Sequence, residues 1–259
     1  IPPHIRVREQ DLPDAPGVYF MKDAEGTVLY VGKATSLKRR VQQHFLRPHS
    51  QLIEEMTQKV REIDYTQTGS ALEALILEAN LIKYYYPHYN TLEKDNKSFL
   101  YLVFTREVYP KPLLIRGKDL EPAAYLAVFG PYTSGRSLRA ALDWLRKILP
   151  WSTCEPGQKR GCFSTHVGLC PGVCNGTITP QDYQRTIRKL IAFFEGKKER
   201  VIEELRREMR AAARAQHFEL AAKLRNQVFA LEHIQDIALL KREEEESPAA
   251  REGEVNILG

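Results

Sequence analysis

The sequence predicts an α/β (α+β) protein with a small central β-sheet flanked by helices, followed by a mixed linker region, a cysteine-rich metal-binding segment and a helical hairpin. Three observations predict this order. Two apolar runs flank a polar turn near the N-terminus, a clear apolar stripe at helical spacing follows, and all four cysteines fall between positions 154 and 174. At 259 residues, the chain can bury a core and form more than one domain.

Local patterns predict the elements of the first 95 residues in order. The runs at 17–22 and 27–33 are rich in β-branched and aromatic residues, as the strands of a hairpin are. Ser36 can cap a helix in which Leu37, Val41 and Phe45 recur every four residues. A helix at 51–61 and a strand at 63–68 follow. The next helix starts at the capping box of Ser70 and Glu73 and ends before Pro87. Its apolar stripe consists of Leu72, Leu75, Ile76, Ala79 and Ile82.

The later part of the chain has weaker local patterns. Residues 97–130 are strand-rich, and helices are predicted at 137–149 and 182–194. A long helical pattern over 201–240 breaks near Gln216 into two amphipathic helices, as in a hairpin. The expected domains are 1–95, 96–150, 151–196 and 197–240, followed by an acidic flexible tail at 241–259.

The net charge of +5 is unevenly distributed along the chain. Residues 101–200 carry an excess of basic side chains, and residues 31–50 contain Lys33, Lys38, Arg39, Arg40 and Arg47 without any acid. Such a patch attracts phosphates and points weakly to nucleic acid, although a solvated helix face is the plainer interpretation. The sequence has no run of about 18 apolar residues and no apolar signal-peptide region, so we expect a cytoplasmic location.

The cysteines follow the spacing C-x7-C-x7-C-x3-C, at Cys154, Cys162, Cys170 and Cys174. Their segment is rich in Gly and Pro, so it buries little apolar surface and needs a metal to fold. Four thiolates suit a tetrahedral Zn²⁺ or a four-iron cluster. Zinc sites usually show two close pairs, and only the last pair here is close, so the spacing leaves the metal open. Without a secretory signal, disulfides are disfavoured.

Several groups suited to phosphodiester hydrolysis lie in one β-α unit. Tyr19 and Tyr30 occupy the two arms of the predicted hairpin, and Lys33, Arg40 and His44 follow in the strand and helix after it. A phenol near a cation loses its proton more easily and can help to deprotonate water. Lysine and arginine neutralise the charge that grows on the phosphate. Taken singly, the two tyrosines would most often be half-buried strand residues with satisfied hydroxyls.

The residues of this unit also resemble a known family. GVY followed by YVG is similar to the GIY-YIG nuclease signature. The stretches GVYFMKDAEGTVLYVGKATSLKRRVQQHF and LEALILEANLIKYYYPHYN resemble the N-terminal domain of UvrC, the incision subunit of bacterial nucleotide excision repair. The resemblance continues through FGPYTSGRSLRAALDWLRKILPWSTC, the four cysteines and the UVR-like hairpin FELAAKLRNQVFALEHI, in the UvrC order. This colinearity covers nearly the whole chain and is far more specific than YVG alone.

The resemblance implies a role for each matching residue. Tyr19 and Tyr30 match the two signature tyrosines, with Tyr30 as the general base and Tyr19 holding or polarising the nucleophilic water. Lys33 matches the lysine directly after the second motif, and Arg40 matches the helix arginine at the scissile phosphate. Glu78, in LEANLIK, matches the single metal-binding glutamate, which would hold one Mg²⁺ or Mn²⁺.

Other positions extend or depart from the family pattern. Asn90 matches a supporting asparagine, and Lys38 and Arg39 extend the basic helix as expected DNA contacts. His44 falls where UvrC proteins often have a tyrosine, which leaves open whether a histidine or a tyrosine shares the proton transfer. For the cysteines, the resemblance favours a [4Fe-4S] cluster, with Zn²⁺ as the competitor. The hairpin would dock on the equivalent hairpin of UvrB through Phe218, Ala221, Leu224 and Val228.

The resemblance implies a metal-dependent DNA endonuclease that repairs DNA damage within the SOS response. It would cut one strand of damaged double-stranded DNA on the 3′ side of a lesion marked by UvrB. A full UvrC carries a second nuclease after the UVR hairpin, whereas this chain stops at EGEVNILG. We therefore expect a fragment or a natural short form without the 5′ incision. The alternatives are a non-cleaving scaffold that binds DNA and UvrB, or a stand-alone GIY-YIG nuclease.

Overall fold

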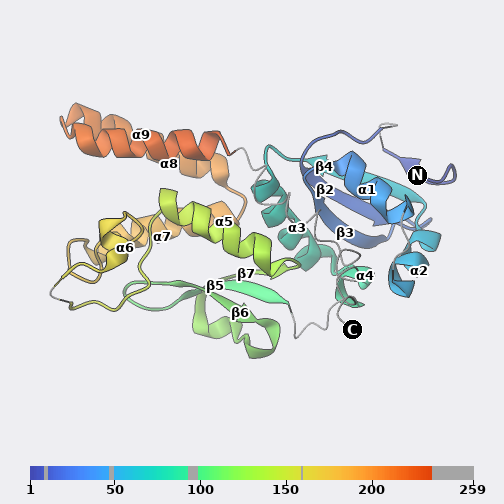
Figure 1. Ribbon diagram of the computed structural model, residues 1–259, viewed down its shortest axis with the longest axis horizontal. Helices are drawn as coiled ribbons and strands as arrows, with labels where there is room; N and C mark the ends of the chain where they lie inside the picture. Colours follow the sequence, from blue (N-terminus) through green and yellow to red (C-terminus); the bar gives the residue numbers. More distant parts are fainter. Residues whose placement is uncertain (9–10, 47–49, 93–98, 159, 235–259) are drawn as a thin grey trace, which may run out of the picture. The chain divides into compact units, whose positions relative to one another are not determined.

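The computed structural model describes residues 1–8, 11–46, 50–92, 99–158 and 160–234. It divides into two compact units, Ile1–Ala74 and Leu75–Ile234. Figure 1 shows their elements in chain order. Arg47 of the basic patch, residues 235–240 of the predicted helix and the acidic tail at 241–259 lie outside the described residues. No helix in the described part of the chain is long and apolar enough to cross a membrane.

The first unit is built on a four-stranded sheet in the order β1-β4-β2-β3. The central hairpin pairs β2 with β3 in antiparallel register, β4 pairs antiparallel with β2, and β1 pairs parallel with β4. Two helices follow the hairpin, and α1 packs against it. The elements are β1 (Arg6–Val7), β2 (Gly17–Lys22), β3 (Val28–Ala34), α1 (Leu37–Leu46), α2 (Gln51–Lys59) and β4 (Glu62–Gln67).

The hairpin turn is held by one side chain and one glycine. The Asp23 carboxylate accepts from the backbone N–H of Thr27 at 2.7 Å and of Glu25 at 3.1 Å. Gly26 has φ +82, a left-handed conformation that residues with a Cβ adopt at a cost. The turn therefore fixes the register in which the two arms of the hairpin meet.

The second unit contains a three-stranded sheet in the order β6-β5-β7, with both pairs antiparallel. The helices α5 and α7 start at side-chain caps, since Ser134 accepts from the N–H of Ser137 and Thr179 from the N–H of Asp182. Its elements are β5 (Leu100–Thr105), β6 (Pro112–Arg116), β7 (Tyr125–Tyr132), α4 (His88–Leu92), α5 (Gly135–Ile148), α6 (Phe163–His166), α7 (Pro180–Phe194), α8 (Lys198–Arg214) and α9 (Phe218–Glu232), with short 3-10 turns at Gly117–Asp119 and Pro122–Ala124.

The helix α3 (Ala71–Tyr85) begins at the predicted capping box. Ser70 Oγ accepts from the N–H of Glu73 at 3.2 Å, and the Glu73 carboxylate accepts from the N–H of Gly69 at 3.1 Å. The division between the compact units falls within this helix, after Ala74. Contacts therefore group the rest of α3 with the second unit, although the sequence places the whole helix in a domain of 1–95.

The predicted fold class is confirmed, with small sheets flanked by helices and a helical hairpin at α8 and α9. The hairpin bends at Gln216, which has a left-handed φ of +59. The short elements β1, α4 and α6 were not predicted, because a few residues carry no usable periodicity. In α1 the buried face consists of Leu37, Val41 and His44, whereas the sequence pattern predicted Phe45 in place of His44.

Candidate functional site

The two signature tyrosines lie together on the β2–β3 hairpin. Tyr19 pairs with Gly32, and Tyr30 pairs with Met21, so both tyrosines point to one face of the sheet. Their ring centroids are 6.0 Å apart, and both side chains are buried. A Cβ at Gly32 would lie 2.4 Å from Tyr19 Oη and 2.8 Å from Tyr30 Cε1. The glycine of the YVG motif therefore provides the space that the Tyr19 ring occupies.

His44 completes this aromatic cluster from α1. Its Nε2 lies 2.7 Å from Tyr19 Oη, and its ring centroid is 5.8 Å from that of Tyr30. His44 is 7% exposed, so the hydrogen bond is shielded from water. The tautomer of the imidazole decides which group donates. In either case the phenol and the imidazole form one hydrogen-bonded pair through which a proton can pass.

The predicted phosphate-binding cations do not all lie on the same side of the sheet as this cluster. Arg40 precedes His44 by one turn of α1, and its Nη1 donates to Gln43 Oε1 at 3.3 Å. Lys38 and Arg39 are exposed and make loose ion pairs at 3.5 Å and 3.9 Å with acidic residues of the loop before β2. Exposed pairs of this kind contribute little to stability. Lys33 pairs with Val18, which places it by strand alternation on the face opposite the tyrosines.

Glu78 and Asn90 belong to the second unit and are both 3% exposed. Glu78 lies on α3, and its Oε2 accepts a hydrogen bond from Thr133 Oγ1 at 3.0 Å. Asn90 lies on α4, whose first turn is closed by the bond from its N–H to the carbonyl of Pro87 at 3.2 Å. A buried carboxylate requires hydrogen bonds or a cation to compensate for lost hydration, so Glu78 suits a metal ligand.

The four cysteines form one compact group in the second unit. All four Sγ atoms lie within 4.8 Å of one another, with Cys154 Sγ 3.6 Å from Cys162 Sγ and 3.9 Å from Cys170 Sγ. Four sulfurs about 2.3 Å from one tetrahedral ion lie about 3.8 Å apart. The same donor set ligates [4Fe-4S] clusters, whose core spaces the sulfurs more widely. The site therefore fits a metal centre, and its sulfur separations match those around a single ion.

Two hydroxyl groups contact the cysteine sulfurs. Ser152 Oγ lies 3.1 Å from Cys154 Sγ, and Thr165 Oγ1 lies 3.3 Å from Cys162 Sγ and 3.4 Å from Cys174 Sγ. The Thr165 hydroxyl, with the backbone N–H of Cys162, lowers the pKa of the Cys174 thiol to about 6. Burial raises the pKa of the Cys154 thiol to about 11. Unlike charged residues, such hydroxyls carry no sequence signal, and the sequence did not predict them.

Ser152 also ties this centre to the rest of the second unit. Its backbone N–H donates to Tyr183 Oη at 3.2 Å, and the Tyr183 hydroxyl donates to the carbonyl of Pro110 at 2.9 Å. Burial is the main reason that the pKa of Tyr183 is raised to about 12, so its hydroxyl stays protonated and remains a donor. The cysteine segment is therefore anchored to α7 and to the loop before β6.

The predicted partner-binding residues of the α8–α9 hairpin differ in how exposed they are. Phe218 is 69% exposed and Ala221 is half-buried, whereas Leu224 and Val228 are each 7% exposed. Because α9 packs on α8, the latter two side chains hold the hairpin together and present almost no surface to a partner. The sequence did not predict the exposure of Phe229, which is 62% exposed and stacks on His233 with a centroid distance of 4.1 Å.

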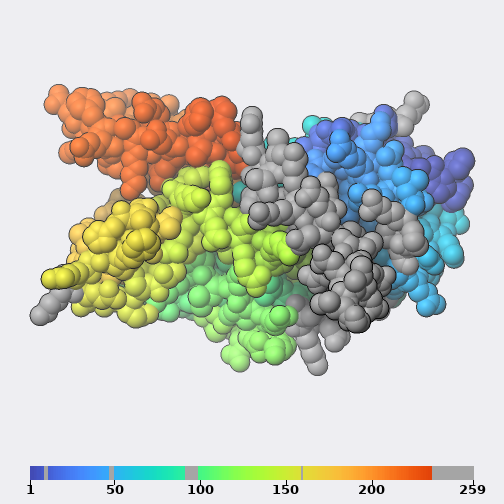
Figure 2. Space-filling view, in the orientation of Figure 1, coloured from blue at the N-terminus to red at the C-terminus, as the bar shows by residue number. Residues whose placement is uncertain are grey.

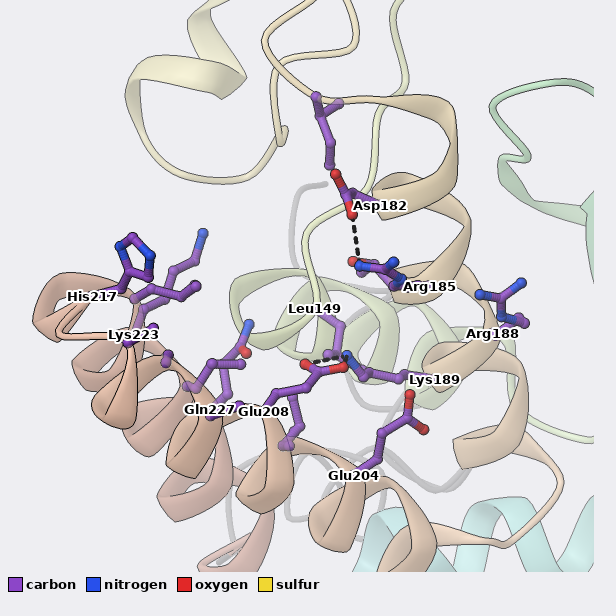
Figure 3. Close-up of a pocket in the computed structure, with 18 residues that line it drawn as sticks. Leu149, Asp182, Arg185, Arg188, Lys189, Glu204, Glu208, His217, Lys223 and Gln227 are labelled. Atoms are coloured by element: carbon purple, nitrogen blue, oxygen red, sulfur yellow. Dashed lines mark hydrogen bonds and ion pairs between the residues drawn. The ribbon is translucent and has the colours of Figure 1, made fainter.

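A groove of about 850 Å³ lies between α7 and this hairpin. Figure 2 shows the hollow beneath the hairpin, which is drawn in orange. Figure 3 shows Lys189 reaching Glu208. The Lys189 side chain is 7% exposed, and its Nζ lies 2.7 Å from both carboxylate oxygens of Glu208. The other charged residues that line the groove are of mixed sign, so this groove lacks the basic character of a nucleic-acid site.

Three family models match successive segments of the chain. Residues 15–91 match the UvrC-like GIY-YIG domain, residues 99–193 the UvrC/Cho excinuclease middle domain, and residues 199–234 the UvrB/uvrC motif. The two nuclease-domain tyrosines, His44, Arg40, Glu78 and Asn90 fall in the first segment, and all four cysteines in the second. The three segments therefore contain, in this order, the tyrosine cluster, the cysteine group and the α8–α9 hairpin.

Curated relatives cover the same region. The UvrABC system protein C of Caldanaerobacter subterraneus is 42% identical over 234 residues, which are 87% of this chain and 37% of the relative. That of Moorella thermoacetica is 40% identical over 252 residues, 94% of this chain and 41% of the relative. The chain thus spans less than half the length of these relatives.

A solved structure is similar to part of the chain. It is the GIY-YIG N-terminal endonuclease domain of UvrC from Thermotoga maritima bound to magnesium, its catalytic divalent cation. That domain is 37% identical and covers 30% of this chain and 86% of its own length, with a TM-score of 0.29.

Proposed function

Because the chain belongs to the UvrC family through residues 15–234, we propose that it is a metal-dependent DNA endonuclease of nucleotide excision repair. Its substrate is damaged double-stranded DNA marked by UvrB, and it cuts one strand on the 3′ side of the lesion. The observation that carries this proposal is the buried hydrogen bond between Tyr19 and His44 beside Tyr30, within the segment that matches the nuclease domain.

The aromatic cluster supplies the proton transfer. Tyr30 acts as the general base: as the phenolate it takes a proton from the attacking water and becomes the neutral phenol, while Tyr19 orients that water. The 2.7 Å bond from Tyr19 Oη to His44 Nε2 fixes the phenol and offers a second acceptor for the proton. General acid–base groups of this kind contribute typically about 10²–10⁴-fold in rate. The histidine thus takes over the role of the tyrosine that the family often has at this position.

Positive groups stabilise the negative charge that develops on the phosphate during the reaction. Arg40 neutralises the charge that develops on the phosphate, and Asn90 supports the site. Lys33 matches the motif lysine, but strand alternation places it on the face opposite the tyrosines, so it is not assigned to the phosphate. Glu78 is proposed to hold one Mg²⁺ or Mn²⁺, which supplies Lewis-acid stabilisation of the phosphoryl oxygens when bound. The burial of Glu78 at 3% exposure supports this role, because a solvated surface glutamate needs no cation.

We propose that Cys154, Cys162, Cys170 and Cys174 hold a [4Fe-4S] cluster, with Zn²⁺ as the alternative. The family resemblance favours the cluster, whereas the sulfur separations of 3.6 Å and 3.9 Å match a single ion. Iron, sulfide and zinc analysis of the purified protein, together with its visible absorption, decides between the two.

The hairpin is proposed to dock on UvrB through its exposed face. Phe218 projects from the first turn of α9 at 69% exposure, and an aromatic anchor of this type is typical of interface hot spots. Leu224 and Val228 then act indirectly, because they keep α9 packed on α8. A pull-down with UvrB separates this proposal from that of a stand-alone GIY-YIG nuclease, which has no need of the hairpin.

The decisive experiment is incision of an end-labelled duplex that carries one bulky lesion, with UvrB loaded and Mg²⁺ present. The native chain is compared with Glu78→Ala. We expect a single cut on the 3′ side of the lesion with the native chain and none with the variant. If the native chain binds UvrB but never cuts, the endonuclease proposal is refuted and the scaffold alternative holds.

A further inference from the structure

The buried carboxylate of Glu78 is held by a side chain that lies far away in the sequence. Thr133 Oγ1 donates to Glu78 Oε2 at 3.0 Å, across 55 residues of chain. An ionised carboxylate only accepts hydrogen bonds, so the threonine hydroxyl must be the donor. The contact therefore fixes the orientation of the Glu78 carboxylate.

Thr133 is itself fixed at a junction between two elements. It follows Tyr132, the buried last residue of β7, and precedes Ser134, the N-cap of α5. The Ser134 side chain accepts from the N–H of Ser137 at 3.1 Å, which anchors the start of the helix. With a paired strand on one side and a capped helix on the other, the backbone at Thr133 has little freedom.

The two partners come from different family segments. Glu78 lies within the match to the nuclease domain, and Thr133 lies within the match to the middle domain. Both belong to the second compact unit, so their contact is internal to it. A carboxylate that binds a metal is usually hydrogen-bonded in turn by a neighbouring group, and loss of such a group typically weakens metal binding about 10–100-fold.

We propose that Thr133 is a positioning residue for the divalent cation of the nuclease, so that the middle domain contributes to the metal site of the nuclease domain. The inference rests on the proposed role of Glu78. Thr133 does not touch the ion. It sets the orientation of the carboxylate that does, and without it the carboxylate loses a partner while buried.

The test is a titration of the full chain with Mn²⁺, without DNA, followed by electron paramagnetic resonance of the free ion. Thr133→Val keeps the shape of the side chain and removes the donor, so we expect its Mn²⁺ affinity to fall at least about tenfold. Thr133→Ala removes the same donor without adding a methyl group and should show the same loss. Thr133→Ser keeps the hydroxyl and should retain native affinity.

The matched control is Thr179→Val, which removes the hydroxyl that caps α7 in the same unit. It should lower the unfolding temperature and leave Mn²⁺ binding unchanged. If Thr133→Val and Thr133→Ala bind Mn²⁺ as the native chain does, or lose no more affinity than Thr179→Val, the inference is wrong. Glu78→Gln separates the two proposals. If it binds Mn²⁺ normally, the proposed metal role of Glu78 fails. If it loses binding while the Thr133 variants do not, only the positioning role fails.

Discussion

Gly32→Ala tests the link between the hairpin and the proposed chemistry. The added Cβ would lie 2.4 Å from Tyr19 Oη, 2.5 Å from Tyr19 Cζ and 2.8 Å from Tyr30 Cε1. Ordinary contacts between carbon atoms are about 3.5–4.0 Å long, so the Tyr19 ring must move by roughly 1 Å. Tyr19 is fully buried, so this movement has no open space to enter.

The displacement has two consequences of known size. Overpacking a well-filled core typically costs about 1–3 kcal/mol of the free energy of unfolding. A shift of roughly 1 Å also breaks the bond of 2.7 Å between Tyr19 Oη and His44 Nε2, because hydrogen bonds weaken beyond about 3.2 Å. Misplacement of a catalytic group by about 1 Å can lower a rate about 10²-fold, which is the loss of incision that we expect.

The assay measures single-turnover incision at saturating UvrB–DNA complex, and urea unfolding of the same preparation. Gly26→Ala is the matched control, because its Cβ meets no atom within 4 Å but its φ is +82. It should cost about 1 kcal/mol of stability through backbone strain, without loss of incision. Native incision by Gly32→Ala would refute the reasoning, and so would an equal loss of incision in the control.

Three further predictions concern the other sites. His44→Phe should lower incision about 10²-fold, and the double variant with Tyr19→Phe should lose less than the product of the two single losses, because the two side chains share one hydrogen bond and their effects on the incision rate are not additive. Uptake of Co²⁺ by the metal-free cysteine site should weaken as the pH falls below about 11, because Cys154 must lose its proton to bind, and it should weaken more steeply below about 6, where Cys174 is protonated as well. Thr165→Val should move this limb of the spectrophotometric titration to higher pH, and an unmoved limb would contradict the role of the hydroxyl. Phe218→Ser should weaken capture by immobilised UvrB at least about fivefold while the unfolding temperature stays native, because this side chain is largely exposed.

The sequence alone determined the local elements of secondary structure and the reactive side chains that the chain carries. The strands of the hairpin, the capping box of α3 and the helices α5, α7, α8 and α9 follow from interactions within one or two turns of chain. The cysteine cluster followed from spacing, since residues close in sequence stay close in space. The order of motifs identified the family, and the family models confirm it over three segments.

Tertiary structure decided which of these residues face one another. The bond of Tyr19 to His44 and the contact of Thr133 with Glu78 join residues 25 and 55 positions apart, and no local pattern encodes either pair. Packing also buried Leu224 inside the hairpin, where periodicity could not distinguish a core stripe from a binding stripe. Local preferences act over a few residues and fix elements, whereas the pairing of distant side chains depends on how whole elements fill space against each other.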